Sequence, residues 1–103
     1  MNISEAIMGI TEIIQDKRDQ ILELADTYGA SNIRVFGSVA AGTADSKSDV
    51  DFLVDLEPGR TLFDLGGFLM DLQKLLGRGV DVVTEKALHW YIRDKVLEEA
   101  RPL

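Results

Sequence analysis

Two short runs of the sequence carry residues that could do phosphate chemistry. Gly37 and Ser38 close an apolar run, ten mostly small or polar residues follow, and Asp49 and Asp51 then open a second apolar run. Residues two apart on a strand point to the same face, so the Cα atoms of the two acids would lie ~6.6 Å apart. Like charges that close repel unless a cation lies between them, and Mg²⁺ prefers carboxylate oxygens. The Asp pair therefore favours a divalent cation site.

A third acid and the glycine turn complete the candidate site. Asp81 lies in another apolar, β-branched run and can join the pair if the two strands are neighbours with their acids on one face. Three such carboxylates would suit metal-assisted phosphoryl or nucleotidyl transfer. Gly37 permits a close backbone approach, Ser38 adds a hydroxyl and an N–H, and a helical turn over 39–41 would point further N–H groups at an anion. The sequence thus predicts a triphosphate site between amide donors and metal.

Taken singly, these features are weak. A Gly-Ser pair occurs in many turns, an Asp-x-Asp is often a solvated edge strand, and a lone strand acid is usually a surface residue. The combined spacing carries the hypothesis. Other motifs fit poorly, because Gly42 is followed by threonine instead of the Lys-Ser/Thr of a P-loop, and Lys47 and Phe52 occupy ligand positions of an EF-hand loop.

Apolar residues at helical spacing predict three helices around these runs. The first would be capped by Asn2 or Ser4 and stopped by Gly29, the second would run from Thr61 to Gly77, and the third from about Lys86 to Glu99. The apolar stripe of the first helix consists of Ile3, Ile7, Ile10, Ile14, Ile21, Leu24 and Tyr28.

Three strands are expected, at 32–36, 50–56 and 79–84. In the second, alternation directs the even-numbered residues to a core and presents the odd-numbered acids on the other face. The order helix, strand, strand, helix, strand, helix predicts one two-layer α/β domain over residues 1–103.

Composition restricts the classes of function. The chain has no cysteine and one histidine, His89, so thiolate and His-rich metal sites are excluded and a metal would be a hard cation held by oxygen. We expect His89 to be a surface residue. The net charge of −7 disfavours direct nucleic-acid binding and a polybasic membrane contact. Because neither a signal peptide nor a membrane span is apparent, we expect a cytoplasmic protein.

The run FGSVAAGTADSKSDVDFLVD, residues 36–55, closely resembles the signature of the DNA polymerase β-like nucleotidyltransferases. More specifically, the chain resembles the minimal nucleotidyltransferases called MNT domains, or MntA-type antitoxins, over essentially its whole length. The resemblance implies an α+β fold with helices packed on a small mixed sheet. It also implies transfer of AMP from ATP to a hydroxyl, with release of pyrophosphate and with two Mg²⁺ ions.

The resemblance also implies roles for individual residues. Gly37 and Ser38 would contact the triphosphate, and Asp49 and Asp51 would hold the metals. Asp81 would bind a metal and help to deprotonate the acceptor hydroxyl. The resemblance further implies a partner, because the better understood members pair with a HEPN-domain ribonuclease toxin, which they neutralise by adding AMP to a tyrosine or simply by binding it.

One departure leaves alternatives open. Relatives commonly carry arginine where this chain has Ala41, although Lys47 or Arg60 could substitute. A binding-only antitoxin without turnover, or a stand-alone enzyme acting on a small hydroxylated acceptor, are therefore alternatives to a protein adenylyltransferase. We expect Trp90 and Tyr91 to pack the last helix on the sheet; the alternative is an aromatic anchor for the partner.

Overall fold

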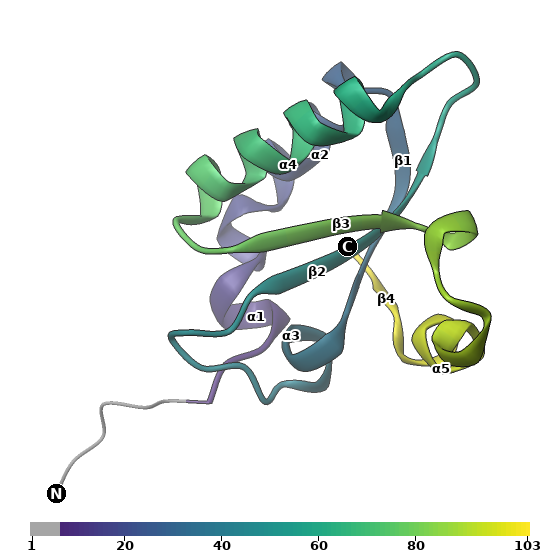
Figure 1. Cartoon of the computed structure of the whole chain (residues 1–103). Coiled ribbons are helices and arrows are strands. Elements are labelled where there is room, and N and C mark those ends of the chain that lie inside the picture. Colours follow the sequence, from purple (N-terminus) through teal and green to yellow (C-terminus); the bar gives the residue numbers. More distant parts are fainter. Residues whose placement is uncertain (1–6) are drawn as a thin grey trace, which may run out of the picture.

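The computed structural model describes residues 7–103, which are arranged around a mixed four-stranded sheet in the order β3-β2-β1-β4 (Figure 1). Strand β2 runs parallel to β3 and antiparallel to β1, and β1 is antiparallel to β4. The strands are β1 Ala30–Phe36, β2 Val50–Leu56, β3 Val80–Thr84 and β4 Arg101–Pro102. This mixed sheet with packed helices confirms the α+β fold that the sequence predicted.

Helices lie on both sides of this sheet. They are α1 Ile10–Ile13, η1 Gln15–Lys17, α2 Arg18–Thr27, α3 Gly37–Ala41, α4 Leu62–Leu76, η2 Glu85–Ala87 and α5 Trp90–Glu99. Helices α2 and α4 lie side by side, and α5 lies across the strands from them (Figure 1). The main core lies between the sheet on one side and helices α2 and α4 on the other. Val50, Phe52 and Val54 of β2 are fully buried in it, as strand alternation predicted. No helix in the described residues has the length and apolarity needed to cross a membrane.

A β-bulge in β1 decides which of its residues face the acids of β2. The pairing shifts by one residue between Ser31 and Arg34, and Asn32 adopts a positive φ of 50° at that point. Beyond the bulge, Arg34 is opposite Leu53, whereas Val35 is opposite Phe52 and is fully buried in the core. The extra residue therefore places an arginine on the acid-bearing face of the sheet.

The leading helix is shorter than the sequence predicted. Met8 exchanges two backbone hydrogen bonds with Ala44, of 2.6 and 3.0 Å, which hold this segment extended. The helix therefore begins at Ile10 and is interrupted at η1 before α2 continues, and Ile7 is 71% exposed. The proposed caps and Ile3 lie outside the described residues. The predicted stop at Gly29 is confirmed, because it adopts a positive φ of 71° directly after α2.

The C-terminal segment also differs from the prediction of one continuous helix. An extended pair, Leu88 and His89, separates η2 from α5, and the unpredicted β4 follows the helix. The expectation that Trp90 and Tyr91 are core residues is wrong, because they are 78% and 76% exposed. They lie in the first turn of α5, whereas the buried residue of that helix is Val96.

Candidate active site

The sheet brings two of the predicted acids directly beside each other. Asp51 of β2 and Asp81 of β3 are partners in the parallel register, on strands that hydrogen-bond to one another. Neighbouring strands lie about 4.8 Å apart and paired residues share a face, so both carboxylates leave the same side of the sheet. Asp49 precedes β2 by one residue, where the Val50 amide donates to the Gly79 carbonyl at 2.9 Å.

The electrostatic environment of Asp51 links the three acids. Burial, followed by the negative charges of Asp81 and Asp49, raises the pKa of the Asp51 carboxyl above its ordinary value. Asp49 and Asp81 are exposed, and no lysine or arginine in the described residues lies within ion-pair distance of any of the three. The site therefore holds uncompensated negative charge, which a bound cation would relieve.

Two glycines make room for these carboxylates. A Cβ atom on Gly37 would overlap Oδ2 of Asp51, and one on Gly79 would overlap Oδ1 of Asp49. Gly37 also has a positive φ of 71°, which side-chain-bearing residues rarely adopt. The Gly-Ser turn thus lies against the Asp51 carboxylate, so the two halves of the predicted site meet. Gly79 has a similar steric role that sequence reasoning missed, because a single glycine before a strand carries no specific signal.

The turn after β1 has the form that the sequence predicted for an anion site. Helix α3 begins at Gly37, directly after the strand, and ends at Gly42, which caps it with a φ of 76°. The first amides of a helix lack partners within it and point along its axis. Ser38 is partly exposed beside them, so a hydroxyl and several N–H groups are available next to the acids.

The loop between α3 and β2 is held by hydrogen bonds. The Asp45 carboxylate accepts from the Lys47 amide at 2.9 Å and from the Ser48 hydroxyl at 3.1 Å, and these two bonds lower the Asp45 pKa. Arg78 donates from one nitrogen to the carbonyls of Asp45 and Ser48, both at 3.0 Å. Arg78 therefore fixes the turn that delivers Asp49. Sequence reasoning missed this residue, since a contact 30 positions away leaves no local pattern.

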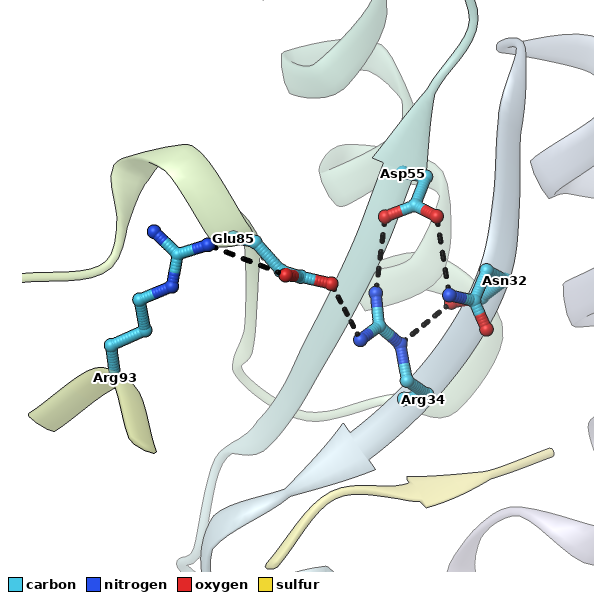
Figure 2. Close-up of polar contacts among 5 residues, drawn as sticks. All are labelled: Asn32, Arg34, Asp55, Glu85 and Arg93. Atoms are coloured by element: carbon cyan, nitrogen blue, oxygen red, sulfur yellow. Dashed lines mark hydrogen bonds and ion pairs between the residues drawn. The ribbon is translucent and has the colours of Figure 1, made fainter. Parts of the chain in front are cut away.

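The other end of the same sheet face carries acids that are compensated. Arg34 lies between Asp55 and Glu85, with nitrogen–oxygen distances of 3.1 Å to each, as Figure 2 shows. The Asn32 amide also donates to Asp55 at 3.1 Å, and Arg93 lies 3.6 Å from Glu85 (Figure 2). Asp55 is thus a structural ion-pair partner, although it has the same strand periodicity as Asp51.

The acids are chemically suited to a hard divalent cation. Their donor atoms are carboxylate oxygens, and the mutual repulsion at Asp51 favours a positive ion. However, no three acids or histidines in residues 7–103 already converge as a ready metal cage. Coordination by the full set would require rotation of side chains, which the exposed Asp49 and Asp81 can undergo on the surface. The donor set therefore fits Mg²⁺ or Mn²⁺.

Two other residues singled out from the sequence, Arg60 and His89, have hydrogen-bond partners of their own. Arg60 is bound to Glu57 at 2.8 Å and to Asp64 at 3.3 Å, beyond the far end of β2, so it cannot replace an arginine at Ala41. His89 is exposed, as predicted, and its Nδ1 accepts from the Tyr91 amide at 3.1 Å as the cap of α5.

Comparisons with known proteins agree with this geometry. The family model for the nucleotidyltransferase domain matches residues 17–103. A protein adenylyltransferase, MntA of Thermococcus cleftensis, is 40% identical over 77 residues, which make up 75% of this chain and 78% of that protein. A solved structure described as that of a minimal nucleotidyltransferase is 45% identical to this chain and has a TM-score of 0.81. That match covers 93% of this chain and 97% of the solved one.

A more distant likeness concerns the fold alone. A chain in a crystal structure of a toxin–antitoxin with AMP-PNP is 21% identical and has a TM-score of 0.70. The match covers 82% of this chain and 69% of that chain. The arrangement of sheet and helices therefore persists at low sequence identity.

Proposed function

This chain belongs to the nucleotidyltransferase domain family, and we propose that it transfers AMP from ATP to a tyrosine hydroxyl of a HEPN-domain toxin, for which it is the antitoxin. The observation that carries this proposal is a group of three acids, Asp49, Asp51 and Asp81, beside the Gly37–Ser38 turn, with no lysine or arginine of residues 7–103 within ion-pair distance. A relative named as a protein adenylyltransferase supports a protein acceptor.

The proposed reaction exchanges one phosphorus–oxygen bond for another. The tyrosine oxygen forms a bond to the α-phosphorus of ATP, and the bond from that phosphorus to the bridging oxygen of the β-phosphate breaks. Pyrophosphate leaves with the electrons of that bond, and the phenolic proton passes to the exposed carboxylate of Asp81. Gly37 and Ser38 hold the triphosphate through backbone N–H groups and a hydroxyl, which orients the α-phosphate toward the acceptor.

The carboxylates Asp49, Asp51 and Asp81 would hold the Mg²⁺ ions that this chemistry uses. When bound, Mg²⁺ neutralises phosphate charge and lowers the pKa of an acceptor oxygen. The chain supplies oxygen ligands for it, and no lysine or arginine in the described part of the chain forms an ion pair with them. These features are the ones that a metal-assisted transfer requires of the protein.

A toxin partner needs a docking surface, and the start of α5 offers one. His89, Trp90 and Tyr91 form an exposed aromatic cluster. The ring centroid of Trp90 lies 5.5 Å from that of His89 and 5.8 Å from that of Tyr91. Exposed aromatic residues are enriched among interface hot spots. The fold neighbour from a toxin–antitoxin crystal structure also supports a toxin as the partner.

Labelled ATP tests the proposal directly. The chain is incubated with Mg²⁺ and ATP labelled on the α-phosphate, with and without a HEPN-domain protein as the candidate partner. We expect label on a tyrosine of the partner, and none with Asp49→Asn. Asp26→Asn, which changes an exposed acid of α2, is the matched control and should label normally. A stable complex without label would instead indicate an antitoxin that acts by binding alone.

The docking surface has its own test in the same complex. Trp90→Ser with Tyr91→Ser should weaken partner binding about thirtyfold or more, because hot-spot truncations cost at least about 2 kcal/mol. Phe63→Ser is the control, since Phe63 is 92% exposed on α4. Unchanged partner affinity in the α5 variant would place the interface elsewhere.

A further inference from the structure

A surface hollow of about 440 Å³ adjoins the Gly-Ser turn. Its walls come from α3, from the loop that follows, and from the end of α5 with β4. The lining residues relevant here are Gly37, Ser38, Ala41, Thr43, Glu99 and Arg101. Because Gly37 also lies against the Asp51 carboxylate, the hollow and the acid group share one wall. A ligand next to the acids can therefore extend into this space.

Arg101 differs from the other arginines in that its side chain has no ion-pair or hydrogen-bond partner within residues 7–103. Arg18, Arg34, Arg60 and Arg93 each lie within 4 Å of a carboxylate, and Arg78 is bound to two carbonyls. Within residues 7–103, Arg101 has neither an ion pair nor a side-chain hydrogen bond, and it is exposed. In a chain of net charge −7, it is an uncompensated positive group at the edge of the candidate site.

The backbone of Arg101 is fixed at this position. It is opposite Val35 in the β1–β4 pairing, two residues before Gly37. The next residues are held as well, since the Leu103 amide donates to the Ile33 carbonyl at 3.1 Å. A guanidinium presents paired N–H donors that match two phosphate oxygens, so it binds phosphate with a defined geometry.

We propose that Arg101 binds anionic oxygens of the nucleotide's triphosphate in the hollow beside Ser38. This role deepens the nucleotidyl transfer proposed above and rests on it. Ser38 adds a hydroxyl to the same hollow, which Thr43 also lines, with its own hydroxyl 3.5 Å from the Ser38 carbonyl. Ala41 supplies no positive charge from α3. In this proposal, the guanidinium of Arg101 supplies that charge from β4 instead.

Glu99 gives the proposal a second consequence of opposite sign. Its carboxylate lines the same hollow without forming an ion pair to Arg101. A negative group there repels the triphosphate that Arg101 attracts. Removing the Glu99 charge should therefore strengthen phosphate binding, whereas removing the Arg101 charge should weaken it.

Binding titrations with ATP and with inorganic tripolyphosphate, at fixed Mg²⁺, test this role. Arg101→Ala should weaken both ligands about ten- to a hundredfold, the range for a lost charge-assisted hydrogen bond. Arg101→Lys should recover part of that loss, and Glu99→Gln should tighten binding by up to about fivefold. Lys74→Ala, which removes one exposed charge from α4, is the control and should bind like the parent. Adenosine alone should bind equally to all variants.

The outcomes separate this role from the proposed function. If the parent chain binds ATP and Arg101→Ala binds it equally, the role of Arg101 is refuted while nucleotide binding stands. If the parent binds neither ATP nor tripolyphosphate, both proposals fail. Should Arg101→Ala not fold, as a thermal melt would show, Arg101→Lys and Glu99→Gln still decide: equal affinity in both overturns the role.

Discussion

Carboxylates at the two ends of one sheet face differ in whether a cationic side chain compensates their charge. At one end, Arg34 lies 3.1 Å from both Asp55 and Glu85 and compensates their charge (Figure 2). At the other end, Asp51 and Asp81 are register partners with no lysine or arginine within ion-pair distance in the described residues. All four residues are acids on β2, on β3 or on η2 directly after β3, so position relative to Arg34 makes the difference.

This contrast distinguishes acids that stabilise the fold from acids that are available for a ligand. A paired carboxylate gains from its arginine, whereas clustered carboxylates without a cation repel each other and destabilise the folded state. Such an arrangement is expected where binding or catalysis requires the charge, because activity and stability often compete at functional sites. The uncompensated end is also where Gly37 meets Asp51.

The largest expected effect separates the two ends by activity. Asp51→Asn should lower AMP transfer by at least about a hundredfold, because it removes a charge that acts on the reacting phosphates. Its free energy of unfolding without metal should stay equal or rise, since the repulsion with Asp81 is relieved. Asp55→Asn is the matched substitution at the other end of β2. It should keep transfer and lose stability by about 0.5–1.5 kcal/mol, the net value of a typical intramolecular hydrogen bond.

Transfer assays and urea unfolding of both variants measure this pair of effects. A marked loss of stability in Asp51→Asn, with metal absent from variant and parent, would assign Asp51 a structural role. Loss of transfer in a stably folded Asp55→Asn would extend the functional site across the whole face.

The next largest effect concerns Arg34, whose positive charge compensates Asp55 and Glu85. Arg34→Met should lower the free energy of unfolding by about 1–3 kcal/mol, because the side chain is only 12% exposed and its loss leaves Asp55 and Glu85 facing each other. Arg93→Met is the control, since Arg93 is 45% exposed and lies 3.6 Å from Glu85. It should cost less than about 1 kcal/mol. Equal unfolding midpoints for the two variants would contradict a special role for Arg34.

The sequence predicted the uncompensated end better than the compensated one. Asp49, Asp51 and Asp81 could be assigned to one face because strand alternation is local, and the structure places Asp51 and Asp81 in register. Asp55 obeys the same alternation, yet its pairing with Arg34 depends on the bulge at Asn32, which sets the register over a long range. No local pattern encodes that register.

The same limit explains the other differences. The helix stop at Gly29 was predictable because glycine permits a positive φ at that point. The start at Ile10 depends on the bridge between Met8 and Ala44, which are distant in sequence. The two-residue strand β4 is likewise defined by its partner β1, so only the folded chain reveals that Arg101 lies next to the candidate site.

The smallest effect sharpens the comparison through pH. Burial and the charges of Asp81 and Asp49 raise the pKa of Asp51, so ionisation of this group opposes folding. Well below about pH 4, the ordinary pKa of an aspartate, Asp51 is protonated in both the folded and the unfolded chain, and Asp51→Asn should match the parent in stability. As the pH rises through the folded pKa, the parent loses stability that the variant keeps.

Asp64, which caps α4, should show the opposite dependence of stability on pH. The Thr61 amide, and then Arg60, lower the pKa of Asp64, so its ionised form stabilises the fold. Asp64→Asn should therefore be less stable than the parent above about pH 4, and this difference should vanish as the pH falls through the folded pKa. Urea unfolding from about pH 2 to 7 with a chelator present measures both series. Parallel pH profiles for the two variants would mean that Asp51 is not held against uncompensated charge, and the contrast between the ends of the sheet would then lose its physical basis.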